Sequence, residues 1–143
     1  MITRVLIVDD EAAFVEALAK RLAKRELNVA IALSGPEALE KIQTEPRTDV
    51  VILDVKMPGM DGIETLKAIK ANWPLVEVIM LTGHATVETA IEGMKLGALD
   101  YLMKPCDMDV LMAKVKEAKS KKRAHEDKIA EARAMSIALR RGD

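Results

Sequence analysis

Acidic, hydroxyl and ammonium side chains follow four short apolar runs of this sequence. Asp9 and Asp10 follow VLIV, and Asp54 follows VVIL. Thr82 follows a third apolar run and Lys104 a fourth. Taken singly, each has an ordinary explanation as a helix cap, a turn former or a surface residue. Because they recur at successive run ends, we interpret them as one functional cluster.

The chemistry that suits such a cluster is binding of a divalent cation and a phosphoryl group. Three close carboxylates repel one another unless a cation shares their site. Mg²⁺ fits because it prefers oxygen ligands, whereas two histidines and one cysteine give little support for a transition-metal site. A carboxylate beside a cation, a lysine and a hydroxyl group can also attack phosphorus and form an aspartyl phosphate.

Five apolar runs alternate with segments of helical periodicity, and this order would position the cluster. The runs are residues 5–8, 29–33, 50–53, 78–81 and 99–103; the helices are 12–25, one capped by Ser34, 62–72, one capped by Thr86, and one capped by Asp107. Such alternation predicts a parallel sheet with helices on both faces. The carboxyl ends of parallel strands share one edge, where ligands bind in open α/β sheets.

Composition favours one soluble globular domain with an aliphatic core. Of 143 residues, 50% are hydrophobic, only 2% are aromatic and 31% are charged, with a net charge of −1. The single Cys106 excludes an intrachain disulfide. No apolar run approaches the roughly 18 residues of a membrane span, and the first run is too short for a signal peptide. We therefore expect a cytoplasmic protein.

Charge is distributed unevenly, with a net −5 over residues 1–115 and +4 over residues 116–143. We interpret the lysine-rich residues 119–123 as a solvated helical face. The less favoured alternative is a patch that contacts nucleic-acid phosphates without sequence specificity. The tail also has a faint heptad pattern. The last helix could run past the domain and pack on a second chain, it could fray, or it could begin a linker of a longer regulator.

Four motifs, VLIVDDE, VVILDVKMPGMDG, VIMLTGHA and DYLMKP, occur in this order. Over residues 3–120 the chain resembles the receiver domain of bacterial two-component response regulators. The resemblance implies an α/β, flavodoxin-like (βα)₅ fold, with a five-stranded parallel sheet of order 2-1-3-4-5 and helices on both faces. It places the receiver at residues 1–120, and leaves 121–143 as a basic helical extension or the start of a linker.

The resemblance also implies roles for individual residues. Asp54 is expected to be the phosphoacceptor, with Thr82 and Lys104 binding the phosphoryl group. The expected Mg²⁺ ligands are Asp9, Asp10, Asp54 and the backbone carbonyl of Lys56, with Asp10 a direct ligand. Thr82 and Tyr101 are expected to act as a switch that alters the surface of the fourth helix, fifth strand and fifth helix. A cis peptide bond is expected between Lys104 and Pro105.

The implied partner is a histidine kinase or a histidine phosphotransfer protein, together with a downstream protein target. A homodimer through the fourth and fifth helices, or through the C-terminal helix, is left open. We do not expect membrane association, nor specific DNA binding, because residues 120–143 are too few for a helix-turn-helix module.

A phosphatase of the haloacid dehalogenase type is the alternative enzymatic interpretation, since it too uses an aspartate at a strand end. Enzymes of that type carry a second acidic residue two positions after the nucleophilic aspartate. In this sequence Lys56 occupies that position. We therefore expect a phosphoacceptor switch that catalyses only its own phosphorylation and dephosphorylation.

Overall fold

The computed structural model describes residues 2–141, which form a five-stranded parallel sheet of order β2-β1-β3-β4-β5. The strands are β1 (Arg4–Val8), β2 (Asn28–Ala32), β3 (Val50–Leu53), β4 (Glu77–Thr82) and β5 (Asp100–Met103). The helices are α1 (Ala12–Ala23), α2 (Gly35–Thr44), α3 (Gly62–Asn72), α4 (Val87–Lys95) and α5 (Met108–Arg141). The predicted order of elements and of strands is confirmed.

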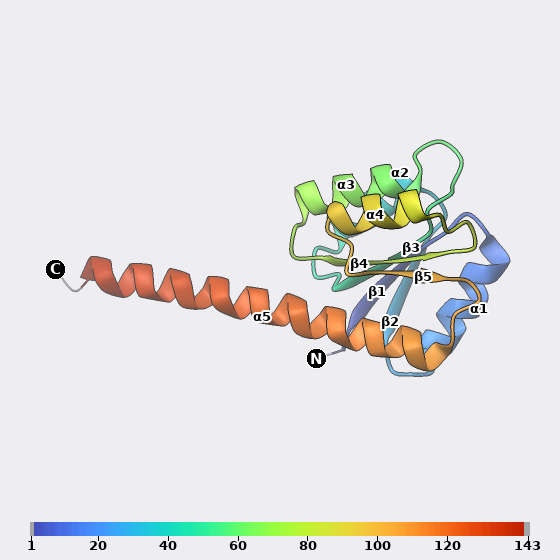
Figure 1. Ribbon diagram of the computed structural model, residues 1–143. Helices are drawn as coiled ribbons and strands as arrows, with labels where there is room; N and C mark the ends of the chain where they lie inside the picture. The colour runs from blue at the N-terminus through green and yellow to red at the C-terminus, as the bar shows by residue number, and fades with distance from the viewer. Residues whose placement is uncertain (1, 142–143) are drawn as a thin grey trace.

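Two helical layers enclose the sheet, with α1 and α5 on one face and α2, α3 and α4 on the other (Figure 1). Successive strand residues point to opposite faces, so β1 alone supplies both cores. Val5 and Ile7 pack in the core beneath α1 and α5, whereas Leu6 and Val8 pack beneath α2 and α3. Double burial explains why the runs VLIV in β1, VVIL in β3 and VIML in β4 are apolar throughout.

Helix starts follow the capping chemistry that the sequence predicts. The side chain of Ser34 accepts a hydrogen bond from the Glu37 N–H, at 3.2 Å, at the start of α2. Thr86 and Thr89 form a reciprocal capping box at the start of α4. The predicted cis peptide bond between Lys104 and Pro105 is present.

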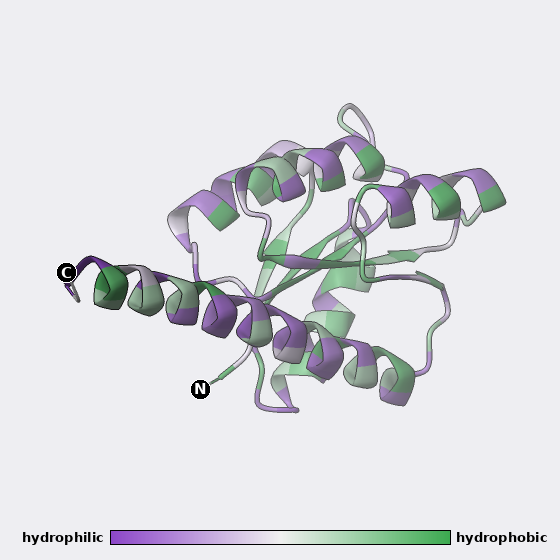
Figure 2. Ribbon diagram, turned by 60° about the vertical axis from the view of Figure 1, so that its left-hand side comes forward, coloured by the Kyte–Doolittle hydropathy of each residue, from purple (hydrophilic) through white to green (hydrophobic). Residues whose placement is uncertain are grey.

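Helix α5 contains 34 residues and runs without a break far beyond the sheet (Figure 1). Its inner turns bury Leu111, Val115 and Ala118, and the boundary expected at residue 120 falls inside it. Along α5, hydrophilic and hydrophobic residues are interspersed (Figure 2). Within residues 2–141, the helices all lack the length or the apolar character needed to cross a membrane.

The lysine-rich segment 119–123 differs from its predicted solvated face. Lys122 is buried and its ammonium lies 3.0 Å from the carboxylate of Asp49. Lys119 pairs with the same carboxylate at 2.9 Å. The prediction was wrong for these two residues because sequence spacing does not reveal an acid presented by the sheet.

Candidate functional site

The polar residues that follow the strands meet at one edge of the sheet. The Asp54 N–H donates to the Val8 carbonyl at 2.9 Å, which places the end of β3 beside the end of β1. The Lys104 N–H donates to the Thr82 carbonyl at 2.8 Å, which joins the ends of β5 and β4 in the same way. Parallel pairing thus carries residues far apart in sequence to a common edge.

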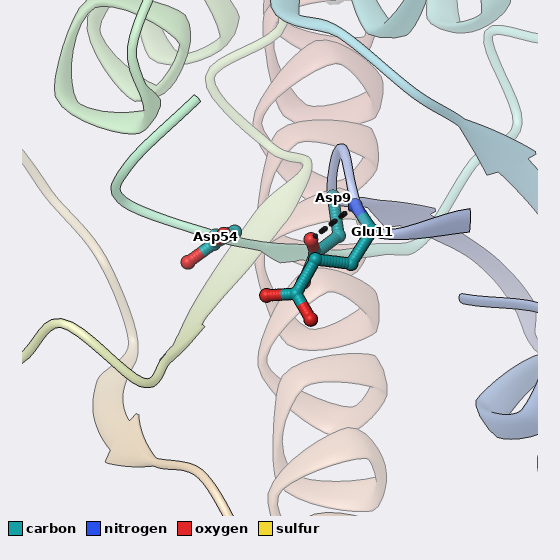
Figure 3. Close-up of side chains that lie close together, drawn as sticks. All are labelled: Asp9, Glu11 and Asp54. Atoms are coloured by element: carbon teal, nitrogen blue, oxygen red, sulfur yellow. Dashed lines mark hydrogen bonds between the residues drawn. The ribbon is translucent and has the colours of Figure 1, made fainter. Parts of the chain in front are cut away.

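An acidic cluster occupies this edge. Asp9, Glu11 and Asp54 each present a carboxylate oxygen, and these oxygens all lie within 4.8 Å of one another (Figure 3). Asp9 and Asp54 are buried, whereas Glu11 is exposed. The Glu11 N–H donates to the Asp9 carboxylate at 3.0 Å, which turns the chain back towards the site. The sequence analysis missed Glu11, although it follows the two aspartates directly in the first motif.

Asp10 is exposed and lies outside the cluster of three that the described residues form. It lines an adjoining open cleft of about 370 Å³ with Glu11, Lys56, Met57, Pro58 and His84. Asp10 and Lys56 thus lie beside the acidic cluster, and their assignment as cation ligands stays a prediction.

Lys104 contributes the positive charge of the site. Its ammonium lies 2.6 Å from the Asp9 carboxylate, 3.7 Å from Glu11 and 4.0 Å from the centre of the Phe14 ring. Burial alone would lower the pKa of Lys104, but its bond to Asp9 and the charges of Asp9, Asp54 and Glu11 raise it. The lysine therefore stays an ammonium, held by carboxylates and by a cation–π contact with Phe14.

The environment of Asp54 disfavours its charged form. Burial raises the pKa of Asp54, and the nearby charge of Asp9 raises it further. Thr82, Lys104 and the Val55 N–H act in the opposite direction without cancelling the rise. The Val55 N–H donates to Oδ1 of Asp54 at 2.8 Å. A cation in the cluster would remove the repulsion between the carboxylates and favour the ionised form.

Thr82 and Tyr101 occupy different parts of the site region. Thr82 is fully buried and its hydroxyl oxygen accepts the His84 N–H at 3.0 Å. The hydroxyl of Tyr101 lies 2.6 Å from that of Thr89 in α4, and the ring packs against Gly93 of the same helix. Tyr101 thus lies between β5 and α4, beside the strand that carries Thr82.

A sequence model of the response regulator receiver domain matches residues 5–116. The chain belongs to the response regulator receiver domain family. Among its relatives, the transcriptional regulatory protein ZraR of Escherichia coli is 46% identical over 114 residues, which cover 80% of this chain and 26% of ZraR. The receiver described here therefore spans about a quarter of the length of that relative.

Solved receiver structures agree with this assignment. The CheY-like receiver domain protein of Methanospirillum hungatei has a TM-score of 0.83 at 32% identity, over 87% of this chain and 99% of that one. A complex of CheX and CheY with BeF₃ and Mg²⁺ from Borrelia burgdorferi has a TM-score of 0.75 at 31% identity, over 80% and 87% of the two chains. The flavodoxin-like fold and the family of signalling switches expected from the motifs are confirmed.

Proposed function

We propose that this receiver accepts a phosphoryl group on Asp54 from a phosphohistidine of a histidine kinase or phosphotransfer protein. The observation that carries the proposal is the convergence of Asp54, Asp9 and Lys104 at one strand edge, with Thr82 at the end of the next strand. A carboxylate nucleophile, a cation site and a lysine are the groups that phosphoryl transfer to an aspartate requires.

The donor set of the cluster fits Mg²⁺. All three clustered side chains offer carboxylate oxygens, which are hard ligands. Asp9, Glu11 and Asp54 would hold the ion, with Asp10 and the Lys56 carbonyl as further candidates from the adjoining cleft. When bound, Mg²⁺ supplies positive charge that favours ionised Asp54 and neutralises phosphoryl oxygens. The related Borrelia complex with BeF₃ and Mg²⁺ supports this assignment.

The residues of the chain carry out the transfer itself. The Val55 N–H holds Oδ1 of Asp54, so we assign the attack to Oδ2. A bond forms between Oδ2 and phosphorus as the bond from phosphorus to the donor imidazole nitrogen breaks, and its electron pair leaves with the imidazole. Lys104 and the Thr82 hydroxyl stabilise the charge on the phosphoryl oxygens. Water later attacks phosphorus, the bond from phosphorus to Oδ2 breaks, and inorganic phosphate leaves as the Asp54 carboxylate is restored.

Phosphorylation would then change the exposed face of α4, β5 and α5. A phosphoryl oxygen draws the Thr82 hydroxyl towards Asp54, and Tyr101 follows into the space that Thr82 leaves. The hydroxyl of Tyr101 is hydrogen-bonded to that of Thr89 in α4, so α4 shifts together with Tyr101. The face carries exposed apolar side chains suited to a protein partner, namely Val87, Ile91, Met94, Met103 and Val110.

The test is incubation with a small phosphodonor and Mg²⁺, followed by intact mass measurement and mapping of the phosphorylated peptide. We expect one added phosphoryl group on residues 50–62, none in Asp54→Asn, and normal acceptance in the exposed control Glu64→Gln. Stoichiometric phosphorylation of folded Asp54→Asn would refute the proposal. Calorimetric titration of Mg²⁺ into Asp9→Asn, Asp10→Asn and Glu11→Gln separates the acids that bind the ion from those that do not.

A further inference from the structure

Buried carboxylates also occupy the opposite edge of the sheet, and α5 supplies their cations. Asp49 precedes β3 directly and is 3% exposed. The ammonium groups of Lys119 and Lys122 lie 2.9 Å and 3.0 Å from its Oδ1. Its Oδ2 accepts the Arg4 N–H at 2.9 Å. Burial alone would raise the pKa of Asp49, but these partners together lower it, so the carboxylate is stabilised as an anion.

Glu77, the first residue of β4, is a second buried acid beside Asp49. It is 1% exposed, and its N–H donates to the Asp49 carbonyl at 3.1 Å. Among the described residues its Oε2 atom is buried without a hydrogen-bond partner, and the nearest ammonium is that of Lys121 at 3.6 Å. A buried carboxylate is costly unless a cation lies close to it, and Glu77 has two lysine charges nearby, that of Lys121 on α5 and that of Lys70 on α3.

Contacts continue along the next turns of α5. Lys122 also lies 3.5 Å from Glu126. A small cleft of about 280 Å³ lies between Leu75 in the α3–β4 loop and Ile129 on α5. Beyond this point the helix projects away from the sheet, with Met135 and Leu139 exposed (Figure 1).

The two strands held in this way are the strands that end at the proposed phosphorylation site. β3 has Asp49 before its first residue and Asp54 after its last. β4 begins at Glu77 and ends at Thr82. The lysines of α5 therefore form ion pairs at the amino ends of β3 and β4. The carboxyl ends of the same two strands carry the proposed phosphoacceptor Asp54 and the hydroxyl group of Thr82.

We infer that Lys119, Lys121 and Lys122 form a brace with Asp49 and Glu77 that fixes the direction of the outer half of α5 relative to β3 and β4. If α5 pivoted at this point, the buried Asp49 carboxylate would lose both of its ammonium partners, so the brace resists bending. The family match covers residues 5–116, so Asp49 and Glu77 lie within it and the brace lysines lie beyond it. The brace stands independently of the proposed phosphorylation.

The brace can be tested by measuring the direction of α5 in the full chain. Spin labels are placed at Lys67→Cys on α3 and Ala134→Cys on outer α5, both exposed, in a Cys106→Ser background. Pulsed electron–electron double resonance gives the distribution of distances between the two spin labels. We expect a narrow distribution in the reference chain and a broad one in Lys119→Met/Lys122→Met, because methionine preserves the helix but not the ion pairs.

Matched controls on the same helix are Lys116→Met and Lys128→Met, which alter exposed lysines without an ion pair among residues 2–141. We expect the controls to stay narrow, and the brace variant to raise the unfolding constant at least about a hundredfold. If the brace variant fails to fold, adding Asp49→Asn removes the unpaired charge while both ion pairs of residue 49 stay broken. A narrow distribution in the folded brace variant or in this triple variant, or equal broadening in the controls, would overturn the inference.

Discussion

Gly62, the first residue of α3, packs directly beneath the turn that follows Asp54. Its N–H donates to the Val55 carbonyl at 2.7 Å. A Cβ atom at this position would overlap the Asp54 carbonyl oxygen and would lie 2.7 Å from the Val55 Cα. These are backbone atoms at the end of a central strand, so they cannot rotate aside as a side chain would. Gly62→Ala must therefore displace the Asp54 turn or the start of α3.

The expected cost follows from two opposing contributions. Overpacking of a rigid site costs about 1–3 kcal/mol or more. Replacing glycine by alanine in a helix returns up to about 1 kcal/mol, and less at a first helical position. We expect a net loss of about 2 kcal/mol, which for a chain of this size lowers the melting temperature by roughly 4–8 °C.

Thermal and urea unfolding followed by circular dichroism measure this loss. Phosphoryl acceptance should also fall, by about tenfold or more, because the displaced turn carries the nucleophile. Gly83→Ala is the matched control, since its Cβ would meet only the Lys104 Cδ at 4.0 Å. If the free energy of unfolding of Gly62→Ala lies within about 0.5 kcal/mol of that of the native chain, or is no lower than that of Gly83→Ala, the steric reasoning is wrong.

Three further predictions concern charge and capping. Folding raises the pKa of Asp54 above its usual 3.8, so ionised Asp54 costs stability as the pH rises through the folded value. In Mg²⁺-free urea unfolding, Asp54→Asn should therefore be more stable than the native chain at about pH 7 but not at about pH 3. Folding lowers the pKa of Asp49, so its stabilisation is present above 3.8 and is lost as the pH falls through the folded value. Acid titration of stability should thus be flatter in Asp49→Asn, and an unchanged acid slope would contradict this. Thr86→Ala removes the acceptor for the Thr89 N–H at 3.1 Å and should cost about 1 kcal/mol, seen as faster hydrogen exchange in α4; Thr44→Ala, outside any N-cap, should leave α4 unchanged.

Most of the fold follows from local patterns in the sequence. Strands that are buried on both faces are expected to be apolar, as in the runs VLIV and VVIL. N-cap side chains such as Ser34 and Thr86 mark the residues where helices begin. Boundaries shifted by one or two residues, for example at β4, which begins at Glu77 rather than at Val78. That shift has a physical reason, because a buried glutamate gives no apolar signal.

The sequence by itself determined the alternation of strands and helices, and with it the edge of the sheet where Asp9, Asp54, Thr82 and Lys104 end up. Those features depend on residue types and on their spacing along the chain, and both can be read directly from the sequence. Only the tertiary structure decided that the Glu11 carboxylate lies beside those of Asp9 and Asp54. It also decided that Lys122 is buried and paired with Asp49, which lies 73 residues away in the sequence. Side-chain convergence of this kind depends on how packed elements are rotated and spaced, and no local pattern encodes it.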